Sequence, residues 1–133
     1  MNAMTERATG TILLCAATVW ESEPLARSLS LKPLSPARFE GVVAGRKIVL
    51  VKTGVGPAAA SAFLSAFGSA EDYHMVLSVG LAGARQPAMA SGDLVIDIQG
   101  ADSELPPAAR ELAAELSLPL HFGRIIHSDE VLV

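Results

Sequence analysis

The sequence is poor in cysteine, in aromatic side chains and in charge. Cys15 is the single cysteine, so no disulfide can form within the chain, and a reducing cytoplasm is the expected compartment. Because Cys15 lies in an apolar run, we expect a small buried hydrophobe there rather than a nucleophile. Aromatic residues make up 5% of the 133 residues and charged residues 18%, but half are hydrophobic, which excludes a disordered chain.

Long apolar runs, basic clusters and metal-binding patterns are also lacking. The run at 11–17 is too short for a membrane span. A net charge of −4 without a dense Lys/Arg run argues against nucleic acid and anionic membrane as partners. No metal is expected, because the three histidines lack ligand spacing. A generic dinucleotide-binding fold is disfavoured, since no Gly-x-Gly-x-x-Gly follows the first apolar run.

The remaining pattern alternates strands with helices, which predicts an α/β fold with a mostly parallel mixed sheet flanked by helices. Residues 1–10 are predicted to be disordered, and 11–133 to form one domain. Residues 32–36 are predicted to be a loop, and 44–46 the turn of an antiparallel hairpin. The expected strands are 11–17, 38–44, 47–53, 75–80, 93–98 and 121–126, and the expected helices are 24–31, 57–68 and 107–118.

The most informative segment is the apolar run that ends in the glycine turn Gly80-Leu-Ala-Gly-Ala84. Glycines at a strand end let the backbone turn tightly and let a ligand approach bare N–H groups. In open α/β sheets, ligands bind at the carboxyl ends of the strands. The alternative is a plain tight turn.

Several segments, taken in order, resemble the purine and uridine phosphorylase superfamily of nucleoside phosphorylases and nucleosidases. They are Leu13–Ala17 with the acidic residues after it, Phe39–Gly56, Ser78–Gly83, Gly92–Ile96 and Gly123–Val133. The resemblance implies cleavage of the N-ribosidic bond of a purine-type nucleoside, a small-molecule substrate, no cofactor, and a homo-oligomer. It assigns substrate contacts to the backbone of Gly80, Leu81, Ala82 and Gly83 and to an apolar base-pocket wall of Leu132 and Val133, although two aliphatics at a strand end are also ordinary core.

The same resemblance points to an acid near the first strand that orients or deprotonates the attacking water. Glu23 is the predicted catalytic residue, with Glu21, two positions earlier, as the alternative. Glu23 also suits a simpler role, because negative charge before Pro24 stabilises the N-terminus of a helix that begins there.

The resemblance favours a nucleosidase over a phosphorylase. The family's phosphorylases place an arginine two residues before the glycine that matches Gly80 and a serine just after it, where this sequence has Ser78 and Leu81. Residues 19–23 are acidic where phosphorylases carry another arginine, and acidic side chains repel phosphate. The subgroup implied is that of methylthioadenosine/S-adenosylhomocysteine nucleosidase and futalosine hydrolase.

In this family the acid that protonates the purine lies downstream of the segment that matches Val133. The resemblance therefore predicts a chain that is incomplete at its C-terminus, with roughly another 80–100 residues needed to finish the domain. The alternatives to water-dependent cleavage are a phosphate-dependent phosphorylase and a non-catalytic, truncated nucleoside-binding remnant.

Overall fold

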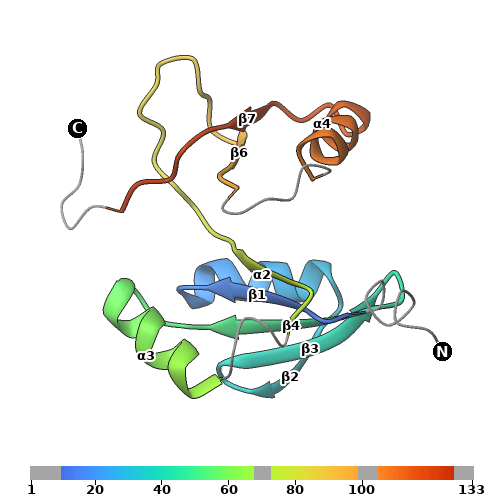
Figure 1. The fold of residues 1–133 in the computed structure, drawn as a ribbon, viewed down its shortest axis with the longest axis vertical. Coiled ribbons are helices and arrows are strands. Elements are labelled where there is room, and N and C mark those ends of the chain that lie inside the picture. Colours follow the sequence, from blue (N-terminus) through green and yellow to red (C-terminus); the bar gives the residue numbers. More distant parts are fainter. Residues whose placement is uncertain (1–9, 68–72, 99–104, 128–133) are drawn as a thin grey trace. The chain divides into compact units, whose positions relative to one another are not determined.

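The computed structural model describes residues 10–67, 73–98 and 105–127, which fall into two compact units, 1–81 and 82–133 (Figure 1). The strands are β1 (Ile12–Ala16), β2 (Lys32–Ser35), β3 (Arg38–Val43), β4 (Arg46–Lys52), β5 (Met75–Ser78), β6 (Leu94–Ile96) and β7 (Leu120–Phe122). The helices are α2 (Val19–Ser28), α3 (Pro57–Phe67) and α4 (Leu105–Glu115). Within these ranges, no helix is both long and apolar enough to cross a membrane.

The first unit contains a five-stranded mixed sheet in the order β2-β3-β4-β1-β5. β1 pairs in parallel with β4 and β5, whereas β2, β3 and β4 form an antiparallel meander. The predicted α/β class and the hairpin are confirmed: Ala44 and Gly45 both have positive φ, as a two-residue hairpin turn requires.

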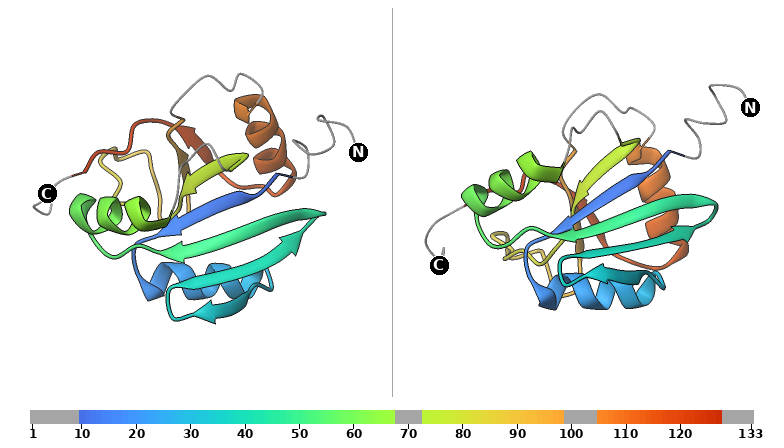
Figure 2. Two further views of the ribbon diagram at one scale, coloured as in Figure 1. Left: turned by 60° about the horizontal axis from the view of Figure 1, so that its bottom comes forward. Right: turned by 90° about the horizontal axis from the view of Figure 1, so that it is seen from below.

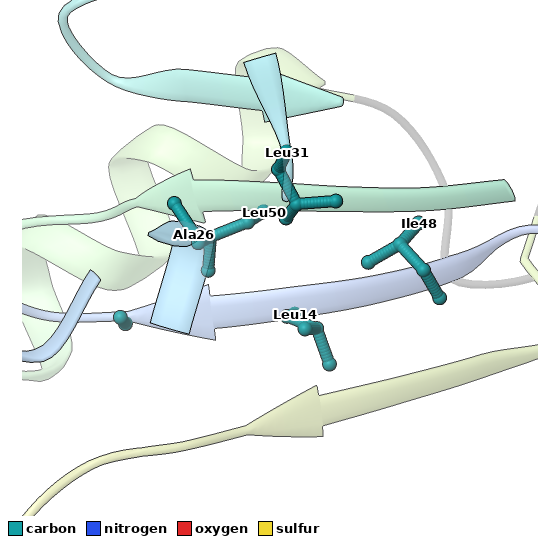
Figure 3. Packing of buried hydrophobic residues seen from close by; sticks show 6 residues of the cluster. Leu14, Ala26, Leu31, Ile48 and Leu50 are labelled. Atoms are coloured by element: carbon teal, nitrogen blue, oxygen red, sulfur yellow. The ribbon is translucent and has the colours of Figure 1, made fainter. Parts of the chain in front are cut away.

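The side chains of β1 alternate between two hydrophobic clusters, one on each face of the sheet. Leu14 and Ala16 pack with Ala26 of α2 on one face, and Figure 3 shows this cluster. Leu13 and Cys15 pack on the other face with Phe63 and neighbouring side chains of α3. Figure 2 shows α2 and α3 on opposite faces of the sheet. This double cover explains the unbroken apolar run at 11–17 and confirms Cys15 as a buried core residue.

Two elements of the first unit differ from the prediction. The first concerns α2, which begins at Val19 rather than at Pro24, so the proline lies inside the helix. The helix ends in a Schellman motif, with Ser30 at a φ of 55° and the Leu31 N–H donating to the Ala26 carbonyl. Burial of Leu31 beside Ala26 fixes that end.

The second concerns residues 32–35, which form the edge strand β2 instead of a loop. Pro33 is tolerated because an edge strand needs ladder hydrogen bonds on one side only.

The second unit is built around the parallel pair β6 and β7, with α4 between them in the sequence. Ala113 of α4 is buried, and the Arg110 guanidinium lies 4.4 Å from the centre of the Phe122 ring. α4 begins at Leu105, two residues before the predicted start, and β7 has three residues where six were predicted.

Candidate functional site

Three parallel strands end at the same edge of the first unit's sheet, which is where the glycine turn begins. β1, β4 and β5 end at Ala16, Lys52 and Ser78. Gly54 N, beyond β4, donates to the Ala17 carbonyl just beyond β1, and Val79 N, beyond β5, donates to the Cys15 carbonyl within β1. This edge is the expected position for a ligand in an α/β sheet.

The Glu21 side chain reaches from the first turn of α2 to the glycine turn after β5. Its Oε2 accepts a hydrogen bond from the backbone N–H of Leu81 at 3.1 Å. Its Oε1 accepts a second from the Thr18 hydroxyl at 2.9 Å. A carboxylate is therefore fixed between the carboxyl ends of β1 and β5 by one donor on each oxygen.

The Glu21 carboxylate can approach the turn this closely only because residue 80 is a glycine. A Cβ built on Gly80 would overlap Glu21 Oε2 and lie 3.0 Å from Glu21 Cδ. The φ of Gly80 is not in the positive range, so the requirement concerns space rather than backbone conformation. The glycine turn thus accommodates the carboxylate of Glu21.

Glu23 lies elsewhere on α2. It is exposed and lines a shallow surface hollow with Trp20, Pro24, Arg27 and Val19. Because α2 begins at Val19, Glu23 is the fifth residue of the helix and not the residue before its first turn. The expected capping role of Glu23 is therefore wrong. Of the two predicted acids, Glu21 is the one that the fold brings to the Gly80 turn.

Of the other predicted site residues, three are exposed and two lie outside the described part of the chain. Leu81 offers its backbone N–H to Glu21, and its side chain is 89% exposed. Ala82 and Gly83 begin the second unit and are exposed. Leu132 and Val133 lie outside the described residues. In the described part of the chain, no group of three or more His, Cys, Asp or Glu side chains is arranged to hold a metal.

Sequence reasoning overlooked Thr18, although a signal was available. Thr18 and Glu21 form the Thr-x-x-Glu pattern of a capping box, in which each side chain bonds the backbone N–H of the other residue. Here the Thr18 side chain makes no capping hydrogen bond and donates to the carboxylate instead. The motif places the N-cap of α2 at Thr18, so that the helix begins at Val19, and it singles out Glu21.

The second unit holds a separate acid–base pair. Asp93 Oδ2 accepts hydrogen bonds from the Ala90 N–H at 3.0 Å and from His121 Nε2 at 2.8 Å. The Ala90 N–H first, and then His121, hold the pKa of Asp93 below its ordinary value. The pair joins the residue before β6 to the middle of β7, so it ties these two strands together.

Comparison with known proteins shows the family of this chain and solved structures of similar fold. The phosphorylase superfamily profile matches residues 11–99. The fold is similar to 5′-methylthioadenosine/S-adenosyl homocysteine nucleosidase of Campylobacter jejuni, with TM-score 0.72, 21% identity, and coverage of 92% of this chain and 66% of that one. No match was found among curated protein sequences.

Two further solved structures have a similar fold. Futalosine hydrolase of Helicobacter pylori gives a TM-score of 0.67 at 18% identity, covering 91% of this chain and 70% of that one. The Neisseria meningitidis nucleosidase, solved with methylthio-immucillin-A, gives 0.68 at 20% identity, with coverage of 90% and 67%. At these identities the likeness is one of fold.

Proposed function

We propose that this chain, which belongs to the phosphorylase superfamily, binds a purine-type nucleoside and takes part in cleaving its N-ribosidic bond with water. The observation that carries the proposal is the Glu21 carboxylate held against the Gly80–Leu81 turn at the carboxyl edge of the sheet. The fold neighbours include nucleosidases and a futalosine hydrolase, which supports the same class of reaction.

Glu21 is the proposed general base. Its Oε2 would accept a proton from a water molecule, whose oxygen attacks the anomeric carbon while the bond to the base breaks and its electron pair leaves with the base. The departing purine then needs a proton, and the family resemblance assigns its donor to a segment downstream of the one that matches Val133. Gly80 and Leu81 provide backbone groups beside the reacting sugar.

Water is favoured over phosphate by the charge at the turn. The Leu81 N–H is the kind of donor that could bind an anion, but Glu21 already occupies it with a negative charge. Phosphate at this point would meet a carboxylate, and Ser78 and Leu81, at the positions where the family's phosphorylases carry an arginine and a serine, bring no positive charge to offset it.

The proposal is tested by incubating the protein with methylthioadenosine, futalosine and inosine, with and without phosphate, and following free base by chromatography. We expect release of base without phosphate. A strict phosphate requirement would favour the phosphorylase alternative. No release from any nucleoside, together with saturable adenine binding, would favour the non-catalytic remnant.

Glu21→Gln and Glu23→Gln form a matched pair, because both replace a carboxylate of α2 by its amide. We expect Glu21→Gln to lower kcat by about 10²- to 10⁴-fold, the usual range for loss of a general base. Glu23→Gln should remain near the unsubstituted protein, because Glu23 is directed to the exposed hollow. The reverse pattern would return the catalytic role to Glu23.

A further inference from the structure

Thr18, the N-cap residue of α2, has the backbone of an ordinary N-cap but uses its side chain differently. Its backbone is extended, with φ −129° and ψ 165°, and its carbonyl accepts hydrogen bonds from the Glu21 and Ser22 N–H groups. A threonine there would ordinarily use its hydroxyl to accept from the first turn. Instead the hydroxyl donates to Glu21 Oε1 at 2.9 Å. The side chain is therefore committed to the carboxylate and not to the helix end.

We propose that Thr18 is a positioning residue, whose hydroxyl holds Glu21 Oε1 so that Oε2 faces the Gly80–Leu81 turn. The inference rests on the proposed function of Glu21 as a base. A glutamate has several rotamers and a freely turning carboxylate, so fixing one oxygen restricts which oxygen meets the water. Thr18 holds Oε1, so we assign the proton to Oε2. The donor on Oε2 is the backbone N–H of Leu81, which lies in an exposed turn where a water molecule can reach the same oxygen.

Two substitutions separate positioning from helix capping. Thr18→Val removes the hydroxyl and keeps the β-branched shape, and Thr18→Ser keeps the hydroxyl. Because the hydroxyl bonds the Glu21 carboxylate and makes no capping hydrogen bond, its removal should lower the melting temperature no more than Glu21→Ala does. A role confined to the helix end would lower the melting temperature and leave kcat unchanged.

The kinetic test compares kcat and KM for these two variants. We expect Thr18→Val to lower kcat about 10-fold, the scale of one lost hydrogen bond to a charged group, with KM within about twofold. Thr18→Ser should restore kcat. Unchanged kcat in Thr18→Val, or equal losses in both variants, would overturn the inference.

A second readout does not depend on activity, and it separates this inference from the proposed function. The amide proton of Leu81 reports its hydrogen bond to Glu21 in ¹H–¹⁵N NMR spectra. In Thr18→Val its resonance should move towards that of Glu21→Ala, whereas Thr18→Ser should match the unsubstituted protein. If no nucleoside is cleaved, the proposed function fails. The Leu81 resonance still decides about Thr18, since an unchanged position in Thr18→Val overturns the positioning role.

Discussion

The Leu81 backbone N–H donates a hydrogen bond to Glu21 Oε2 over 3.1 Å, joining residues that are 60 positions apart in the chain. The contact links the first turn of α2 with the segment that follows β5. It is possible because β1 and β5 are adjacent parallel strands, so that the segments beyond their carboxyl ends meet.

Replacing Gly80 by alanine should separate activity from stability. The new Cβ would displace the Glu21 carboxylate, which is the movable end of a flexible side chain. The free energy of unfolding should therefore change by less than about 1 kcal/mol. Loss of the Leu81 hydrogen bond should lower base release about 10-fold or more. Chromatography and thermal melting measure the two effects.

Gly123→Ala provides the matched control for that substitution. A Cβ on Gly123 would meet only a Val95 methyl group, at 4.0 Å. Both activity and melting temperature should stay near those of the unsubstituted protein. Full activity in Gly80→Ala would contradict the site, because the Glu21 carboxylate could not keep its present place.

The Asp93–His121 pair should make the second unit sensitive to acid. The pKa of Asp93 is lower in the folded state than its ordinary value of 3.8, so the ionised form stabilises the fold. That contribution is fully present above 3.8 and is lost as the pH falls from there through the lowered pKa. We expect Asp93→Asn to lower the melting temperature at neutral pH and to flatten its decline in acid.

Thermal melting from neutral to strongly acidic pH tests this dependence. Glu111→Gln, an exposed substitution on α4, serves as the control and should keep the acid decline of the unsubstituted protein. An Asp93→Asn protein with the same decline as that control would show that the pair does not contribute.

Leu50 should be the position in the first unit where a truncation is costly. Its side chain has no exposed surface and lies in the cluster under α2. Leu50→Ala should lower the free energy of unfolding by about 2–5 kcal/mol through lost burial and a cavity. Val42→Ala, at a site 71% exposed, should cost less than about 1 kcal/mol. Urea denaturation measures both, and similar costs would contradict the described core.

Much of the first unit follows from local pattern. The apolar runs at 11–17 and 47–53 predicted two central strands, because a strand covered on both faces needs no polar alternation. Pro57 marked the start of α3 because its fixed φ suits a first helical position. The start of α2 was predicted wrongly because Pro24 was given that same position, whereas it lies inside the helix, whose Ala26 packs in the core.

The sequence by itself determined that a carboxylate follows the first strand and that a glycine turn follows a later one, because residue type and local periodicity depend only on neighbours in the chain. Only the tertiary structure decided which acid meets that turn. Parallel pairing of β1 with β5 sets their carboxyl ends side by side, and the start of α2 at Val19 directs Glu21 to Leu81 and Glu23 to the exposed hollow. A shift of two residues turns a helical side chain by about 200°, so sequence proximity could not distinguish them.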